Sequence, residues 1–429
     1  MRLLFSALAL CAAVLGQAAD QDYPLAEAQE VRARGGLPNF FLKAQTTGAE
    51  VKIGYLGGSI TAQNGWRVQT LAHFKKAYPQ ATFAEINAAI GGTGSDLGVF
   101  RVQQDVLSKG PDLLFVEFAV NDGGADPQRI IRAMEGIVRQ TWKANPSTDI
   151  CFVYTITEAL SPPMLEGKLQ RSASAMEKVA DHYGIPSITL GMEVAKLAKA
   201  GKLLWRAKLP KTADERAALA DRFVFAPDST HPHESTGHVL YTQAIVRSLP
   251  ALAIANATPT PHVIGPALDA ANWERAKLVP ITGAKLSAGL ASADPATDAH
   301  AKVWAKRLPV MVKLTRPGQS LEFRFQGTHC AVYDVVGPAG GKVAVTLDGG
   351  KPFVVQRIDA YGTYPRLSTF IVGTDLAEGV HSVRLELLAD PIDKAAVLAK
   401  NKNKIDKPER FAPLEFHPGG LLLVGELVP

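Results

Sequence analysis

The sequence predicts two domains of different fold class, an α/β domain followed by an all-β domain. Between about residues 50 and 250, short continuous apolar runs alternate with longer amphipathic runs. This alternation is typical of parallel strands covered by helices on both faces. Beyond about residue 276, short β-rich runs are separated by turn sequences, as in an antiparallel β-sandwich.

The first domain has five predicted strands and three clear helices. The strand runs are rich in β-branched and aromatic residues and do not alternate, which suits a sheet buried on both faces. They cover residues 51–58, 82–90, 112–120, 149–156 and 187–190. The amphipathic helical runs cover residues 68–78, 129–145 and 171–184. Asp126 as N-cap and Pro127 at the first helical position favour a start for the middle helix.

The second domain is predicted from eight β-rich runs between residues 310 and 427, with PAGG, DGG and AEG as turn signals. We therefore expect a signal peptide at 1–19, an α/β domain at 20–255, a linker at 256–275 and a β-sandwich at 276–429. The linker assignment depends on the Ala-, Pro- and Thr-rich composition of residues 251–266.

The N-terminal residues predict export. Arg2 precedes a short apolar run, small residues and Asp20, as in a secretory signal peptide. The run is too short for a comfortable membrane span. Leu10 stands before Cys11 where a lipoprotein anchor would need a small residue. We expect a periplasmic or extracellular protein without a lipid anchor.

The remaining composition is that of an ordinary globular protein. Among 429 residues, 47% are hydrophobic and 20% are charged, and the net charge of +5 is not gathered into one patch. No nucleic-acid partner is therefore expected. Cys151 and Cys330 lie in apolar runs and are expected as buried thiols, although a disulfide in an oxidising compartment remains open. The oligomeric state stays undetermined.

The predicted strand 51–58 ends in two glycines followed by Ser59. Ligands of open α/β sheets gather at the carboxyl ends of strands, so the serine hydroxyl is expected at the functional edge. The stretch is not a phosphate-binding loop, because it has neither G-K-[ST] nor G-x-G-x-x-G. It also lacks G-x-S-x-G, since Thr61 takes the last position.

Three further stretches supply what an activated serine needs. Residues 86–95 end a strand in Gly91, Gly92 and Gly94, where the backbone can turn an N–H outward. Asn121 ends the third strand with an amide donor. Asp228 and His231 lie three residues apart, so one short turn can carry a base and the carboxylate that orients it. Together these groups predict acyl transfer through a serine nucleophile.

These stretches resemble the four signature blocks of the SGNH (GDSL-like) hydrolase superfamily. The blocks read GGSIT, INAAIGGTGS, FAVND and DSTH, and they lie in the family's order. The resemblance covers roughly residues 50–250. It implies a flavodoxin-like, three-layer α/β/α hydrolase domain with a parallel sheet, followed here by a jelly-roll-like β-sandwich.

The resemblance also implies a role for each matching residue. Ser59 would be the nucleophile, His231 the general base and Asp228 its orienting carboxylate. The oxyanion hole would consist of the Ser59 N–H, the Gly92 N–H and the Asn121 side chain. Gly91 competes with Gly92 for this role. Ala119 departs from the family pattern, which usually has glycine two residues before the asparagine.

Several other residues have two interpretations. His233 and His238 could bind a metal with His231, but no cysteine or carboxylate cluster completes a site, so no metal is expected. Trp66 could stack on a sugar ring or pack in the core. Tyr361 and Arg366 could contact a ligand from the second domain, although tyrosines at strand ends more often pack. Glu117 is expected as a buried structural carboxylate.

These observations predict an exported serine esterase that removes acetyl or other short acyl groups from a polysaccharide or oligosaccharide. No metal or organic cofactor is needed. The acetyl and carbohydrate parts follow from the resemblance, because secreted members with GGSIT and a β-sandwich are often polysaccharide deacetylases. A lipid esterase or thioesterase, a carbohydrate-binding protein and a transacylase remain alternatives.

Overall fold

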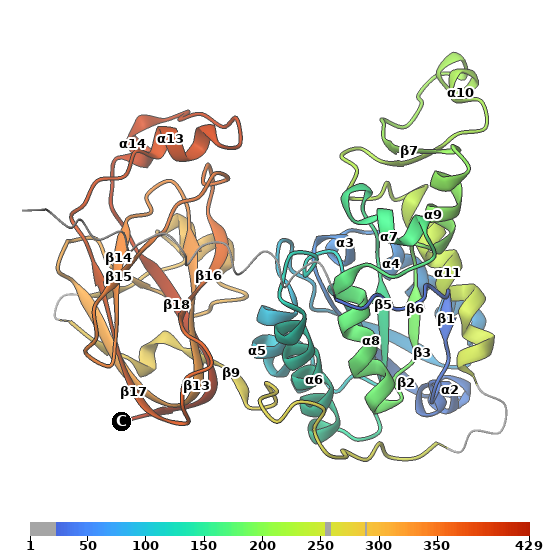
Figure 1. Ribbon diagram of the computed structural model, residues 1–429, viewed down its shortest axis with the longest axis horizontal. Coiled ribbons are helices and arrows are strands. Elements are labelled where there is room, and N and C mark those ends of the chain that lie inside the picture. The colour runs from blue at the N-terminus through green and yellow to red at the C-terminus, as the bar shows by residue number, and fades with distance from the viewer. Residues whose placement is uncertain (1–22, 254–258, 288–289) are drawn as a thin grey trace, which may run out of the picture. The chain divides into compact units, whose positions relative to one another are not determined.

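Residues 23–253, 259–287 and 290–429 are described by the computed structural model of the chain (Figure 1). The predicted signal peptide lies outside these residues. The chain divides into two compact units, Met1–Trp273 and Glu274–Pro429. In the part of the chain that is described, no helix combines the length and the apolar character needed to cross a membrane.

A six-stranded sheet forms the centre of the first unit. Its order is β1-β6-β5-β4-β2-β3, and all pairs are parallel except the β1–β6 pair at the edge. The five parallel strands follow the flavodoxin-like order, which confirms the predicted fold class. The strands are β1 (Val31–Arg32), β2 (Glu50–Gly57), β3 (Thr82–Asn87), β4 (Leu113–Glu117), β5 (Asp149–Tyr154) and β6 (Ser187–Thr189).

Helices cover both faces of this sheet (Figure 1). One layer consists of α5 (Ser95–Asp105), α6 (Pro127–Ala144) and α8 (Arg171–Tyr183). The other contains α2 (Pro38–Gln45), α4 (Trp66–Ala77), α9 (Met192–Lys199) and α11 (Gly237–Leu252). Four short helical turns lie between the strands and the longer helices. They are α3 (Ser59–Ala62), η1 (Leu107–Lys109), η2 (Glu158–Leu160) and α7 (Pro162–Leu165).

Helix α6 begins where the sequence predicts. The Asp126 carboxylate accepts a hydrogen bond of 3.0 Å from the Arg129 N–H, and Pro127 is the first helical residue. The cap satisfies an N–H that has no partner within the helix. Ile130, Met134 and Ile137 of its apolar face are buried. The predicted face therefore packs in the core.

A parallel strand pair was not predicted from the sequence. Strands β7 (Leu203–Arg206) and β8 (Phe223–Ala226) pair, and α10 (Ala213–Leu219) lies between them in the chain. Most of β7 and all of α10 are partly or fully exposed, and each of the two strands has only four residues. The sequence pattern therefore indicates β7, α10 and β8 only weakly.

The segment before the second unit packs on the first unit, although its composition indicates a linker. His262 hydrogen-bonds the Asp149 carboxylate at 2.8 Å, and Arg132 pairs with Asp269 at 2.8 Å. Trp273 is buried against Phe100. A few large or charged side chains within an Ala- and Pro-rich stretch therefore attach it to the domain.

The second unit is antiparallel, as predicted. Eight strands form one hydrogen-bonded sheet in the order β15-β14-β17-β13-β18-β9, with β10 and β16 also paired to β13. The strands are β9 (Ala276–Pro280), β10 (Lys285–Leu286), β13 (Ser320–Val336), β14 (Lys342–Leu347), β15 (Phe353–Gln356), β16 (Arg366–Gly373), β17 (Gly379–Leu387) and β18 (His417–Val428).

The long strand β13 belongs to both layers of this β-sandwich. Its first half pairs with β17 and its second half with β16, and the register shifts after Gly327. Gly327 has φ 155°, and a Cβ there would lie 2.1 Å from the Val424 carbonyl oxygen. Only glycine fits this bend. Leu321, Phe325 and Val332 of β13 are buried in the core between the layers.

Shorter elements lie around the sandwich. They are η3 (Ile281–Gly283), β11 (Ala291–Ser292), α12 (Ala299–Trp304), β12 (Val312–Lys313), α13 (Lys394–Ala399) and α14 (Pro408–Phe411). Cys151 and Cys330 are both buried free thiols, so the possible disulfide is not formed. Burial raises the pKa of each thiol.

Candidate active site

Ser59 lies at the carboxyl end of β2, as the first residue of the short turn α3. The two glycines before it are required by close packing. A Cβ on Gly57 would lie 2.8 Å from the Glu117 carbonyl oxygen, and one on Gly58 would lie 1.8 Å from Oδ1 of Asn121. Glycine therefore lets the nucleophile turn approach the end of β4 and the Asn121 amide.

His231 joins Ser59 to Asp228. Its Nε2 lies 2.8 Å from the Ser59 Oγ, and its Nδ1 lies 2.7 Å from Oδ2 of Asp228. The base and the carboxylate come from the segment between β8 and α11, whereas the serine comes from β2. This is the hydrogen-bonded line that an activated serine requires.

The turn around Asp228 fixes its carboxylate. Oδ1 accepts the Thr230 N–H at 3.0 Å and the His231 N–H at 2.8 Å, which leaves Oδ2 for the imidazole. Ser229 has φ 65° within this turn. Burial alone would raise the pKa of Asp228, but the hydrogen bonds from His231 and Thr230 outweigh it and lower the pKa. The carboxylate therefore stays ionised and aimed at Nδ1.

Three predicted oxyanion groups lie around Ser59. The Ser59 N–H is in the first turn of α3, where a helix offers no internal acceptor. Gly92 has φ 72°, a conformation that glycine adopts freely. A Cβ on its neighbour Gly91 would lie 3.5 Å from the Ser59 Cβ, so this loop borders Ser59. Asn121 borders Gly58 from the β4 side.

A buried arginine holds the two strand ends together. Arg101 of α5 donates to the Ala88 carbonyl just beyond β3 and, at 3.4 Å, to the Gly57 carbonyl at the end of β2. It also pairs with Asp105 at 2.9 Å. Arg101 thus joins the end of β2, which precedes Ser59, to the loop that carries Gly92. Arg101 was not singled out by the sequence, because no helix was predicted over the residues of α5.

Asp122 fixes the other end of that loop. Its carboxylate accepts the Ser95 N–H at 3.0 Å, and a Cβ on Gly94 would lie 2.1 Å from its Oδ1. Burial, together with the charge of Asp96, raises the pKa of Asp122 to about 7. Asp122 follows Asn121 directly, so it fastens the loop that carries Gly92 to the segment that carries Asn121.

Glu117 is the buried structural carboxylate that the sequence predicts. It accepts hydrogen bonds from Thr155 at 2.6 Å and from Thr61 at 2.8 Å. Burial raises its pKa despite these bonds. Through Thr61 it supports the turn that begins at Ser59.

His238 and His233 have structural partners. The Trp66 N–H donates to His238 Nδ1 at 3.1 Å, and Nε2 lies 3.2 Å from the Gln63 side-chain oxygen. Burial, with a smaller contribution from the nearby His231, lowers the pKa of His238 to about 4. His233 Nε2 lies 2.9 Å from the Ala207 carbonyl oxygen. Both imidazoles therefore brace the loops around the triad.

The suggestion that Trp66 stacks on a sugar ring is wrong. Its side chain is fully buried and packs against Tyr55 and Phe115 in the core. Trp66 begins α4, and the first residues of that helix turn inward toward β2 and β4. The core interpretation, which the sequence left open, is the correct one.

In the second unit, Tyr361 lies on the segment between β15 and β16, and Arg366 is the first residue of β16. Tyr361 is 54% exposed, and the Arg366 guanidinium lies 5.3 Å from its ring centre. Arg366 also pairs with Asp359. This arrangement holds one face of an exposed aromatic ring against a cation.

The first unit thus combines a sheet of flavodoxin-like order with a strand-end serine hydrogen-bonded to a His–Asp pair, the arrangement on which serine-dependent acyl transfer relies. Residues 55–235 match the GDSL-like lipase/acylhydrolase family, and this unit therefore carries a domain of that family. No curated protein matches the sequence.

Two solved structures share the fold over both units. One is a two-domain esterase (CEX) active on acetylated mannans, co-crystallised with mannopentaose. It is 18% identical, with a TM-score of 0.68 over 94% of this chain and 100% of that chain. A second structure of a two-domain esterase (CEX) active on acetylated mannans is 20% identical, with a TM-score of 0.68 over 93% and 99% of the two chains.

Proposed function

We propose that this chain is an exported serine esterase that removes acetyl groups from a carbohydrate through an acyl-enzyme on Ser59. The observation that carries the proposal is the hydrogen-bonded line from Ser59 through His231 to Asp228. The GDSL-like acylhydrolase match supports the reaction class.

The reaction begins with the Ser59 hydroxyl. His231 Nε2 takes its proton while Oγ attacks the acetyl carbonyl carbon. The charge that develops on the carbonyl oxygen is stabilised by the Ser59 N–H, the Gly92 N–H and the Asn121 amide. His231 then gives the proton to the departing sugar oxygen, which leaves an acetyl ester on Ser59.

A water molecule completes the turnover. His231 takes a proton from the water, which attacks the acetyl-serine, and returns it to Oγ as acetate leaves. Asp228 holds the Nδ1–H throughout and stabilises the imidazolium that forms in each half-reaction. This chemistry requires no metal or organic cofactor.

The carbohydrate assignment depends on the site's openness and on the fold of the second unit. The side chains of His231 and Asp228 are 37% and 48% exposed. Such a site suits a bulky sugar leaving group better than a long acyl chain that needs a deep apolar channel. The structures that share both units are esterases active on acetylated mannans. The predicted signal peptide would deliver the enzyme to extracellular polysaccharide.

The experiment is acetate release from a panel of acetylated mannan, xylan and algal polysaccharides. 4-Nitrophenyl acetate and a long-chain 4-nitrophenyl ester serve as controls, and Ser59→Ala as the blank. Release from one glycan, abolished in the variant, would support the proposal and identify the substrate. A clear preference for the long-chain ester would indicate a lipid esterase. Glycan retention without turnover would indicate a binding protein, and acetyl transfer to an added glycan would indicate a transacylase.

A further inference from the structure

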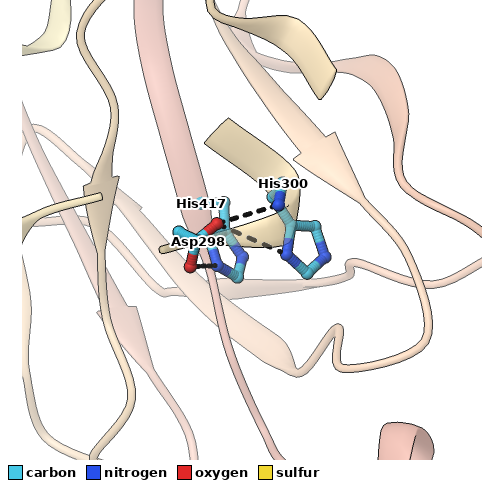
Figure 2. Close-up of side chains that lie close together, drawn as sticks. All are labelled: Asp298, His300 and His417. Carbon is cyan, nitrogen blue, oxygen red and sulfur yellow. Dashed lines mark hydrogen bonds and ion pairs between the residues drawn. The ribbon is translucent and has the colours of Figure 1, made fainter. Parts of the chain in front are cut away.

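Asp298, His300 and His417 lie close together in the second unit (Figure 2). Asp298 caps α12, His300 is in that helix, and His417 is the first residue of β18. Each offers one metal-ligating atom, and these atoms lie within 4.8 Å of one another. Residues more than a hundred positions apart in the chain thus bring two imidazoles and a carboxylate close together.

His417 has an unused ring nitrogen in this cluster. Its side chain is 2% exposed, and its Nε2 is buried without a hydrogen bond. The nearest carboxylate oxygens are Oε2 of Glu415 at 3.5 Å and Oδ2 of Asp298 at 3.7 Å. Because a buried polar atom without a partner is costly, this nitrogen points to a ligand.

The other nitrogen ligand is also close to Asp298. His300 Nδ1 lies 3.7 Å from Oδ1 of Asp298, and Figure 2 shows the carboxylate joined to both histidines. The two rings stack 4.0 Å apart with 19° between their planes. The nitrogen lone pairs of each imidazole point outward in the plane of its own ring, and in two stacked rings they do not converge. Metal binding therefore requires one ring to rotate about its side-chain bonds.

One lysine contacts two carboxylates at the cluster. Lys313 lies 3.1 Å from Asp298 Oδ2 and 3.0 Å from Glu415 Oε1. One ammonium therefore faces two carboxylates. Lys313 competes with a metal for the Asp298 oxygen.

We propose that Asp298, His300 and His417 bind one divalent transition-metal ion, such as Zn²⁺, that fastens α12 to β18. Two imidazoles and one carboxylate favour zinc-like ions over Ca²⁺ or Mg²⁺, which prefer oxygen ligands. Glu415 or water would supply the fourth ligand. The ion would be structural and would take no part in the esterase reaction.

The test uses the full chain after removal of metals with a chelator. Zn²⁺ binding is measured by calorimetry, Co²⁺ coordination by its visible absorption, and stability by thermal unfolding. We expect one Zn²⁺ per chain with a Kd below about 1 µM, a raised Tm and the absorption of nitrogen-ligated Co²⁺. His417→Gln and His300→Gln should each weaken binding at least about 100-fold.

His381→Gln is the matched control. His381 is a histidine of the same unit that contacts a carboxylate, but its two ring nitrogens already lie 2.7 Å from Asp348 and 2.9 Å from the Ala377 carbonyl. Its substitution should leave binding unchanged. Lys313→Met should tighten binding, because it removes a competing cation.

The absence of stoichiometric binding by the wild-type chain would overturn the proposal without any variant. It would also be overturned if His417→Gln and His381→Gln bound Zn²⁺ alike, or if Lys313→Met weakened binding. Each of these results would identify the cluster as a metal-free ion network in which Lys313 is the resident cation.

Discussion

The carboxylate of Asp228 shows how much one residue can organise. It accepts hydrogen bonds from the backbone N–H groups of Thr230 and His231 and from the imidazole of His231, all within four residues of the chain. The spacing of Asp228 and His231 could be read from the sequence because both lie in one local turn. Their approach to Ser59, 172 residues away from His231, could be expected only through the resemblance and the strand-end rule.

Asp228→Asn is the first prediction at this scale. An amide at this position cannot hold the Nδ1–H tautomer or offset the imidazolium charge, so kcat for 4-nitrophenyl acetate should fall about 100- to 10,000-fold. His231→Ala should cost more, because it removes the base itself. Steady-state kinetics of both variants at pH 7.5 measures this. An unchanged rate in Asp228→Asn would exclude the assigned role.

His238 provides a second prediction, for stability. Its pKa is lowered to about 4 by burial, so the unfolded chain binds the proton more readily between about pH 4 and pH 6.5. The contribution of His238 is complete above pH 6.5 and is lost as the pH falls toward 4. Between pH 7.5 and pH 5 the loss is about 2 kcal/mol.

The measurement is urea unfolding of the wild type and His238→Gln at pH 7.5 and pH 5. The variant should be less destabilised, relative to wild type, at pH 5 than at pH 7.5. Asp122, whose pKa is raised to about 7, gains stability as the pH falls, but it is present in both proteins and cancels in the difference. Equal destabilisation at both values would contradict the prediction.

At the scale of elements, the site is assembled where three neighbouring parallel strands end. The turn after β2 carries Ser59, the loop after β3 carries Gly92, and the segment after β4 carries Asn121. The sequence predicted these three ends because continuous apolar runs stop there in glycine or asparagine. It could not predict Arg101, because its contacts to Gly57 and Ala88 depend on how α5 packs over the strand ends.

Gly58→Ala tests this packing. The new Cβ would lie 1.8 Å from Asn121 Oδ1 and would push the amide out of the oxyanion position. We expect kcat to fall about 100- to 1000-fold, as for Asn121→Ala. Gly124→Ala is the control, since no atom lies within 4 Å of its Cβ position in the same loop region. Equal rates for Gly58→Ala and the wild type would show that Asn121 does not act from this position.

The whole molecule consists of two units whose folds the sequence predicted to different depths. The parallel sheet and most of its helices follow from apolar runs. Strands β7 and β8 do not, because each has only four residues, and the packed segment up to Trp273 does not, because small residues and prolines dominate its composition. In the second unit, the β-rich runs predicted the strands. They did not predict that β13 bends at Gly327 to serve both layers.

A prediction at this scale concerns the role of the second unit in substrate binding. Tyr361→Ala removes an exposed ring that Arg366 holds in place. If the ring contacts the glycan, KM for the acetylated polysaccharide should rise about 3- to 10-fold. The effect on 4-nitrophenyl acetate should be smaller. Val354→Ala, at a 55% exposed position of the same unit, is the control. Equal KM values for wild type and Tyr361→Ala would assign the tyrosine no role.

The central claim is that Ser59 forms the acyl-enzyme, and covalent labelling tests it most directly. The protein is treated with a 4-nitrophenyl alkylphosphonate, which transfers a stable phosphonyl group to an activated serine, and the labelled peptide is mapped by mass spectrometry. The account predicts one label per chain on Ser59, activity lost in step with labelling, and almost no reaction in His231→Ala. Full esterase activity without a label on Ser59, or a label on another residue that parallels the loss of activity, would contradict it.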